Sequence, residues 1–66
     1  MKNTLKIQRA VKNVTQQELA DVIGVSRQTI NSIEAGKYVP STLLALKMAR
    51  YFGKKVEEIF ILEEED

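Results

Sequence analysis

Two short helices separated by a glycine turn, within residues 16–35, limit what this chain can fold into more than any other feature. Thr15 and Glu18 fit a capping box at the start of the first helix: the Thr15 hydroxyl accepts the third helical N–H, and the Glu18 carboxylate accepts the N–H of Thr15. Gly24 ends this helix, because only glycine takes a left-handed backbone there without steric cost. Ser26 is a favourable N-cap for the second helix. The chain must therefore turn sharply between two helices of about two turns each.

Helices joined so tightly cross steeply, and their point of contact has room only for a small side chain. Ala20 supplies that side chain, and Leu19, Ile30 and Ile33 are placed to fill the angle between the helices. An ordinary helical hairpin in a small bundle would show the same spacing. The residues on the outer face of the second helix distinguish that hairpin from a pair of helices with a functional surface.

The residues before this pair predict a first helix over residues 4–13. Ile7, Val11 and Val14 follow one another at spacings of four and three residues, so they share one line along the helix. Leu5 lies off that line. We therefore expect one side of this helix to pack inward and another side to meet something else.

The residues after the pair predict two more helices. Ser41 is the N-cap of a fourth helix that runs to Phe52, and its apolar residues cover more than one stripe, so it needs a second packing partner. Residues 56–60 fit one turn of a fifth helix, and residues 61–62 extend either into a strand or into a further turn. The elements together predict an all-α fold, a compact five-helix single domain over residues 1–66.

The composition excludes several functions for so small a chain. It has no Cys and no His, so it forms neither a disulfide nor a metal site with thiolate or imidazole ligands. No pair of side chains is placed as nucleophile and base, and no glycine-rich loop is present to hold a phosphate. We therefore predict that the chain is not an enzyme and binds no cofactor or metal, and that packing and self-association stabilise its core.

No apolar run approaches the roughly 18 residues that a membrane span requires, and residues 1–10 lack the apolar centre of a signal peptide. The expectation is a cytoplasmic protein that does not contact membranes. So small a chain also has little volume for an inducer pocket, and we predict no small-molecule ligand.

The charges are unevenly distributed, although the net charge is only +1. Residues 1–55 hold ten basic and three acidic side chains, a net charge of +7, and residues 56–66 hold the other six acids and no base. A cationic body with an anionic end attracts nucleic acid or anionic lipid. An ordinary solvated surface can carry the same charges, so the charge raises the possibility of nucleic-acid binding without deciding it.

The outer face of the second helix of the pair favours DNA reading over a plain hairpin. A bundle helix carries Glu and Lys on such a face for solubility. This face instead holds one arginine and several uncharged hydrogen-bonding residues: Arg27, Gln28, Thr29, Asn31 and Ser32. Arg pairs with guanine, Gln and Asn pair with adenine, and Thr contacts the thymine methyl group, so these residue types suit base edges in the major groove.

The motif Thr-Gln-Gln-Glu-Leu-Ala, followed by Gly-Val-Ser-Arg-Gln-Thr-Ile-Asn-Ser-Ile-Glu-Ala-Gly-Lys, closely resembles the phage repressor and Cro-type (XRE-like) helix-turn-helix family. The resemblance covers residues 5–60, with the helix-turn-helix at residues 16–35 and a short tail at residues 60–66. It implies a repressor-like DNA-binding domain, in which the chain ends of some small members pair as a short antiparallel sheet. The implied function is a stand-alone, sequence-specific transcriptional regulator, with a repressor favoured.

The resemblance also implies roles for single residues. Gln16 matches a position that contacts a backbone phosphate and braces the recognition helix, while Lys37 and Tyr38 match the loop that holds the opposite strand of the duplex. Most outer-face positions approach bases in that family, whereas Asn31 contacts either a base or a phosphate. The predicted DNA-binding residues are Gln16, Ser26, Arg27, Gln28, Thr29, Asn31, Ser32, Lys37 and Tyr38.

Arg9 and Glu34 match a pair that forms a salt bridge in that family and ties the first helix to the end of the third. We interpret Arg9 as structural rather than as a phosphate contact, because an unpaired Glu34 near DNA would repel it. The sequence departs from the family pattern at Gln8, where aliphatic residues are common, and at Asn13, where glycine is frequent. Neither position touches the reading face, but both leave the packing of the first helix open.

A single recognition helix reads only about four or five base pairs, too few to select one operator in a genome. We therefore expect a homodimer that binds a palindromic operator in double-stranded DNA, with its recognition helices about 34 Å apart. Surplus apolar surface on the fourth helix and near the chain end gives the interface candidates, which are Leu44, Tyr51, Ile59, Phe60, Ile61 and Leu62. In the alternative arrangement, Phe60 and Leu62 fold back and cap the core of their own chain.

A second function from another class uses the same fold: an antitoxin or accessory module that binds another protein. Such proteins usually add a tail or a domain for their partner, and about six residues follow Phe60 in this sequence. DNA reading is therefore the preferred interpretation.

Overall fold

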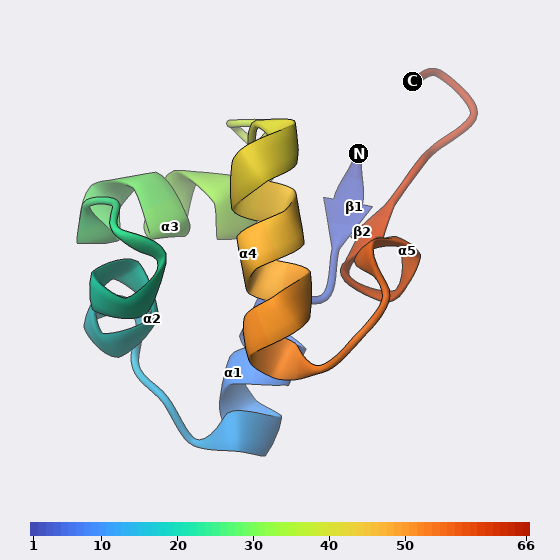
Figure 1. Cartoon of the computed structure of the whole chain (residues 1–66). Coiled ribbons are helices and arrows are strands. Elements are labelled where there is room, and N and C mark those ends of the chain that lie inside the picture. The colour runs from blue at the N-terminus through green and yellow to red at the C-terminus, as the bar shows by residue number, and fades with distance from the viewer.

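The computed structural model describes all residues from 1 to 66 and contains five helices and one two-stranded antiparallel sheet (Figure 1). The predicted helical fold with a short pair of terminal strands is confirmed. None of the helices is both long enough and apolar enough to cross a membrane. In chain order the elements are β1 (Lys2–Asn3), α1 (Leu5–Lys12), α2 (Gln16–Ile23), α3 (Arg27–Glu34), α4 (Thr42–Phe52), α5 (Val56–Ile59) and β2 (Phe60–Ile61).

Local hydrogen bonds set the ends of α2 and the start of α3. Thr15 Oγ1 accepts the N–H of Glu18 at 3.0 Å, and Glu18 Oε1 accepts the N–H of Thr15 at 3.0 Å, so the predicted capping box is present. Gly24 ends α2 with a φ of 86°, in the left-handed region. Ser26 Oγ accepts the N–H of Thr29 at 3.1 Å and caps α3. The predicted starts of α2 and α3 are therefore correct.

Asn13 ends α1 and explains one departure from the family pattern. Its φ is 59°, so it takes the left-handed conformation that glycine usually supplies. Asn tolerates this conformation better than most other residues, because its short polar side chain can hydrogen-bond locally. The chain therefore ends α1 as a glycine would end it, at a modest conformational cost.

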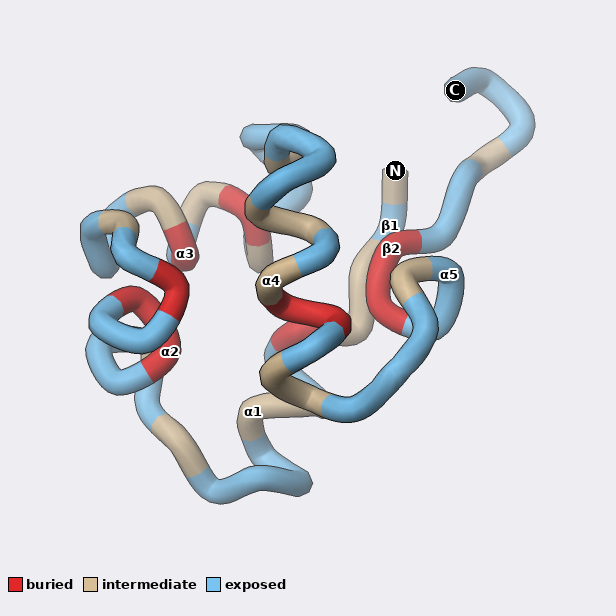
Figure 2. The backbone as a smooth tube through the Cα atoms, viewed as in Figure 1, coloured by how far each residue is buried: buried red, intermediate tan, exposed pale blue.

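The core lies between the facing sides of the helices, where the buried segments in Figure 2 turn toward one another. Leu5 is fully buried, whereas Ile7 and Val11 are 60% and 77% exposed, so the side of α1 that carries Leu5 is the one that packs inward. Thr4 fixes this orientation, since its N–H donates to the carbonyl of Ile59 at 2.8 Å. The buried residues are Leu5, Leu19, Ala20, Ile23, Ile30, Ile33, Met48, Ala49, Ile59 and Phe60.

The strands β1 and β2 bring the two ends of the chain side by side (Figure 1). Asn3 lies opposite Phe60 in this antiparallel pair, and Asn3 Nδ2 donates to the carbonyl of Ile33 at 2.9 Å. Phe60 is buried in the core of its own chain, while Leu62 is exposed. Of the two residues considered for folding back, Phe60 does so and Leu62 does not.

Candidate nucleic-acid interface

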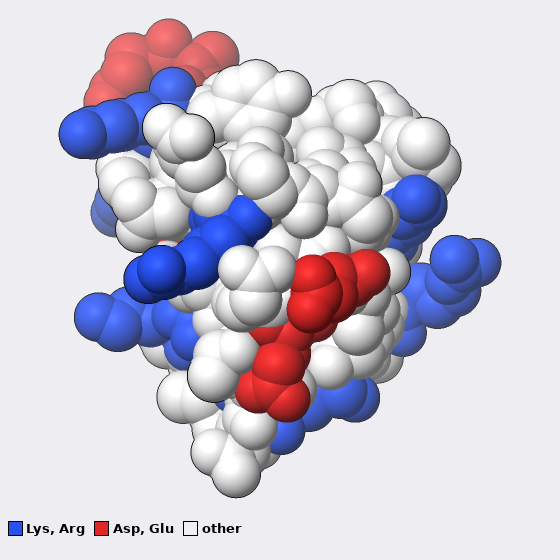
Figure 3. Space-filling view, turned by 90° about the vertical axis from the view of Figure 1, so that its left-hand side faces the viewer, with Lys and Arg blue, Asp and Glu red and all other residues white.

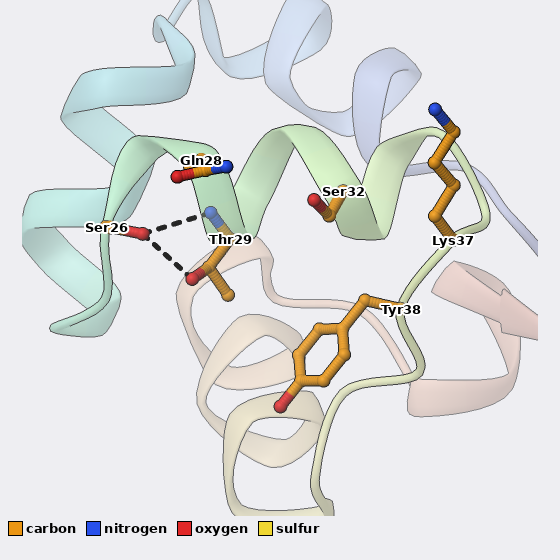
Figure 4. A pocket seen from close by; sticks show the side chains of 6 residues that line it. All are labelled: Ser26, Gln28, Thr29, Ser32, Lys37 and Tyr38. Atoms are coloured by element: carbon orange, nitrogen blue, oxygen red, sulfur yellow. Dashed lines mark hydrogen bonds between the residues drawn. The ribbon is translucent and has the colours of Figure 1, made fainter.

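The helix α3 separates its apolar and polar side chains onto opposite sides. Ile30 and Ile33 are buried, Arg27 and Gln28 are exposed, and Thr29 is half-buried. Asn31 and Ser32 also lie on the outer side, exposed and half-buried respectively. Figure 4 shows the polar residues following α3 toward the loop after it, which carries Lys37 and Tyr38. The residues predicted to meet bases thus share one surface with the residues predicted to meet phosphate.

Two shallow hollows flank α3, with volumes of about 310 and 290 Å³. Gln28 lines both of them, so its side chain lies on the outer surface of α3 between the two hollows. The hollow toward α2 is lined by Gln16, Arg27, Gln28 and Asn31. The hollow toward the following loop is lined by Ser26, Gln28, Thr29, Ser32, Lys37 and Tyr38 (Figure 4).

The end of α3 is held by hydrogen bonds from α1 and α2. Arg9 Nε lies 2.5 Å from Glu34 Oε2, and Arg9 Nη2 donates to Glu34 Oε1 at 3.1 Å. Gln16 Nε2 donates to the same Glu34 Oε1 at 3.1 Å and to Asn31 Oδ1 at 3.3 Å. Arg9 Nη1 also donates to the carbonyl of Val14 at 3.1 Å. Three helices are joined at this carboxylate, so α3 cannot rotate without breaking these bonds.

The side chains of Arg9 and Glu34 are 15% and 8% exposed, so their ion pair is largely out of water. The hydrogen bond to Glu34 raises the pKa of Arg9 above its usual value, with a further contribution from the charge of Glu34. All three guanidinium nitrogens of Arg9 donate within the protein, to Glu34 and to the carbonyl of Val14. The pair also neutralises the carboxylate nearest the outer face of α3, which would otherwise repel DNA.

Ser26 uses its hydroxyl within the protein. In addition to capping α3, its Oγ lies 2.9 Å from Thr29 Oγ1, and both hydrogen bonds are drawn in Figure 4. Ser26 therefore orients Thr29 and fixes the start of the helix.

A third hollow, of about 630 Å³, lies at the start of α2. It brings Arg27 together with Asn13 and Gln17, which the sequence analysis did not identify as candidate contacts. The start of a helix presents N–H groups without an intrahelical acceptor, and such groups favour an anion. The polar residue two positions before the capping box, Asn13, is the signal that would have pointed to this position.

Of the two helices α2 and α3, only α2 carries exposed acidic side chains. Figure 3 shows the face that carries α2 and α3, with an acidic patch near its centre, a second acidic group farther back at the upper left, and Lys and Arg projecting around the edges. The acids exposed on α2 are Glu18 and Asp21, and Gln17 Nε2 donates to Asp21 Oδ1 at 2.9 Å. The helix α3 has no exposed acid, so a phosphate backbone beside it meets no unpaired negative charge on that helix.

The candidates for a dimer interface differ strongly in exposure. Ile59 and Phe60 are buried within the chain, and Leu44 is half-buried against the core. The ring of Tyr51 is covered by Lys12, whose Nζ lies 4.5 Å from the ring centroid, and it packs edge-on against Phe52. Ile61 and Leu62 alone among these candidates keep a large exposed surface.

Comparison with known proteins identifies close relatives. A family model described as helix-turn-helix matches residues 5–59. An uncharacterized HTH-type transcriptional regulator of Methanocaldococcus jannaschii is 58% identical over 66 residues, which are 100% of both chains. Another such regulator, from Bacillus subtilis, is 50% identical over 100% of both chains. The ImmF control region 10 kDa protein of Bacillus phage phi105 is 34% identical over 65 residues, 91% of this chain and 72% of the phage protein.

Proposed function

Because this chain belongs to the helix-turn-helix family, we propose that it is a sequence-specific DNA-binding regulator, a repressor that binds a palindromic operator as a homodimer. The family inferred from the sequence is confirmed by the match over residues 5–59. The relatives from Methanocaldococcus jannaschii and Bacillus subtilis are named as transcriptional regulators, which supports a regulatory rather than a catalytic role. In this proposal α3 lies in the major groove and reads the operator.

The observation that carries the proposal is the outer face of α3. Arg27 and Gln28 are exposed near the start of the helix, and neither side chain forms a hydrogen bond within the protein. Their donors and acceptors are therefore free for base edges, Arg for guanine and Gln for adenine. The bonds to Glu34 hold α3 in a fixed orientation, so these side chains are presented without a prior rearrangement.

Phosphate contacts are available on both sides of α3. Lys37 and Tyr38 lie on one side, and the start of α2 lies on the other. Both amide hydrogens of Gln16 are used within the protein, by Asn31 and Glu34. We therefore assign the phosphate contact at this position to the free N–H groups of the first turn of α2, and the bracing role to the Gln16 side chain.

The experiment that tests this function is the selection of bound sequences from a random pool of double-stranded DNA. We expect enrichment of one inverted repeat, whose half-sites lie about one helical turn apart, centre to centre. A titration of the selected duplex by gel shift at several salt concentrations should then show a steep fall in affinity with salt. A module that binds only proteins would enrich no sequence and show no such slope.

Gln28→Ala should weaken binding to the selected operator by about 1 to 3 kcal/mol, because it removes a two-point contact with one base. The preference at that base position should relax, and thermal stability should hardly change since the side chain is exposed. Fluorescence anisotropy on the operator and on random-sequence DNA measures both effects. An equal loss on the two duplexes would contradict base reading by Gln28.

Lys37→Ala should act differently, because a phosphate contact is present on every sequence. We expect affinity for operator and random DNA to fall by similar factors, and the slope of log K against log salt to become shallower by about 1. Lys54→Ala, in the loop between α4 and α5, is the matched control and should leave the slope unchanged. An unaltered slope for the Lys37 variant would remove this residue from the interface.

A further inference from the structure

A hollow between α2 and α4 carries positive charge that no carboxylate of the protein pairs with. We define the cationic hollow by its lining residues, Val22, Ile23, Lys47, Arg50 and Tyr51, which surround a volume of about 290 Å³. It lies where the end of α2 packs against the second half of α4 (Figure 1). The two hollows that flank α3 share none of these residues.

Three cations lie around the ring of Tyr51. Lys47 and Arg50 line the hollow with it, and Lys12 Nζ lies 4.5 Å from the centroid of the ring. Both lysines donate only to backbone carbonyls: Lys12 Nζ to Tyr51 at 3.3 Å, and Lys47 Nζ to Ile23 at 3.4 Å. Arg50 is exposed, and its guanidinium forms neither a hydrogen bond nor an ion pair within the protein. Like charges gathered in this way create a positive potential that attracts an anionic group.

The acids of α2 and of the chain end are engaged elsewhere. Glu18 Oε1 accepts a backbone N–H at the start of α2, and Asp21 Oδ1 accepts an amide hydrogen of Gln17 at 2.9 Å. Glu63 and Asp66 pair with the N-terminal ammonium, at 3.1 and 3.0 Å. Carboxylates that pair with the cationic hollow would therefore have to come from another molecule.

The cationic hollow also exposes apolar surface. The side chain of Val22 is 57% exposed, next to the buried Ile23 and the ring of Tyr51. An apolar side chain that covered Val22 would be stabilised by the removal of both surfaces from water. Aromatic residues and arginine are enriched where proteins contact one another, and this hollow contains one of each.

We propose that the cationic hollow binds an acidic segment of a partner protein. An apolar side chain of that segment covers Val22, and carboxylates on either side of it pair with Arg50 and Lys47. A DNA backbone matches this surface less well, because its phosphates and sugars bring no apolar group to Val22. A lipid surface also matches it less well, since an interfacial helix inserts a continuous apolar face, whereas this apolar surface is confined between two helices.

The position of the cationic hollow allows a partner and DNA to bind together. The phosphate contacts proposed for α2 lie at its start, whereas Val22 and Ile23 lie at its end. Eight residues of helix span about 12 Å, so the two places are well separated. A partner at the end of α2 leaves the outer face of α3 uncovered. This inference does not depend on DNA reading, and a failed DNA selection would leave it unaffected.

A titration of the full chain with a short peptide tests the proposal. The probe is the acetylated and amidated peptide Glu-Glu-Leu-Leu-Glu-Glu, and heteronuclear NMR of isotope-labelled protein at low salt detects its binding. We expect saturable shifts in the backbone signals of Val22, Ile23, Lys47 and Arg50, with a dissociation constant on the order of 1 mM or lower. The peptides Gln-Gln-Leu-Leu-Gln-Gln and Glu-Glu-Ser-Ser-Glu-Glu each lack one of the two required features, and each should bind at least about fivefold more weakly.

Charge reversal at Arg50 tests where the peptide binds. Arg50→Glu should raise the dissociation constant by about tenfold or more, because a carboxylate would then face the carboxylates of the peptide. Lys54→Glu is the matched control: it changes the net charge equally at an exposed position outside the hollow, and it should leave the constant nearly unchanged. Val22→Ser should weaken binding of the leucine peptide but not of the serine peptide. Circular dichroism verifies that the variants fold.

Several outcomes would overturn the proposal. One is the absence of saturable shifts at peptide concentrations up to about 5 mM, and another is an equal loss for Arg50→Glu and Lys54→Glu. A shallower salt slope of DNA binding for Arg50→Glu would make Arg50 a phosphate contact instead. Sedimentation of the wild type, but not of Arg50→Glu, with phosphatidylglycerol vesicles would assign the hollow to a lipid surface. Shifts of the same signals with protein concentration alone would assign it to a second copy of the chain.

Discussion

Replacing Arg9 with Ala should lower the free energy of unfolding by about 3 kcal/mol, a large share of the stability of so short a chain. The Glu34 side chain is only 8% exposed in the intact protein, and the substitution removes its cationic partner. Gln16 would then be the remaining side-chain donor to that carboxylate, and an amide does not balance a charge removed from water. Urea unfolding followed by circular dichroism measures the change.

Two variants show whether the loss comes from the pair rather than from the arginine alone. Arg50→Ala removes an exposed arginine on α4 and should change stability by less than about 0.5 kcal/mol. The double variant Arg9→Ala with Glu34→Ala should recover part of the loss, since no unpaired carboxylate is left. Equal losses for Arg9→Ala and Arg50→Ala would contradict the role assigned to the ion pair.

Ala20→Leu should destabilise the chain by about 3 kcal/mol, the upper end of what overpacking of a core usually costs. Ala20 is fully buried, and its carbonyl accepts the N–H of Gly24 at 2.8 Å and of Val25 at 3.0 Å. A leucine there would push α2 away from α3 at the turn that joins them. The DNA-reading face would lose its orientation together with the fold.

Differential scanning calorimetry of Ala20→Leu measures this loss as a lower melting temperature. Val22→Leu is the control, because Val22 is on the same helix with its side chain exposed, and its melting temperature should hardly move. A melting temperature that Ala20→Leu leaves unchanged would mean that the two helices do not meet at Ala20.

The helices were predictable where local hydrogen bonds decide their ends. Thr15, Glu18 and Ser26 lie within a few residues of the N–H groups that they cap, so a short window of sequence contains both partners. Gly24 is equally local, since its left-handed backbone depends on the residue itself. The starts of α2 and α3 therefore followed from the sequence.

The inward side of α1 depends on contacts that no such window contains. Leu5 is buried and Ile7 is exposed because Thr4 is bonded to the carbonyls of Glu58 and Ile59 at the other end of the chain. The spacing of Ile7 and Val11 indicates an apolar line but does not reveal which neighbour covers it. In the structure, the side chains of Ile7 and Val11 are exposed to solvent.

The candidate site depends both on local sequence patterns and on contacts between residues that are far apart in the chain. The outer face of α3 follows from helical spacing, whereas the Arg9–Glu34 pair was expected only from the family resemblance, since 25 positions separate the two residues. The hollow of about 210 Å³ beside α4 could not be predicted, because Met1, Leu46 and Phe60, which line it, come from separate parts of the chain. Their convergence depends on the pairing of β1 with β2.

Arg27 and Gln28 are exposed and form no hydrogen bonds within the protein, and this affects how the DNA sequence that is recognised can change. Neither side chain supports the core or the hydrogen bonds that hold α3, so each can be exchanged with little cost in folding. Grafting other residues at these two positions should redirect the protein to a new half-site while the framework stays intact. Related proteins with this framework could therefore diverge quickly in the promoters that they recognise.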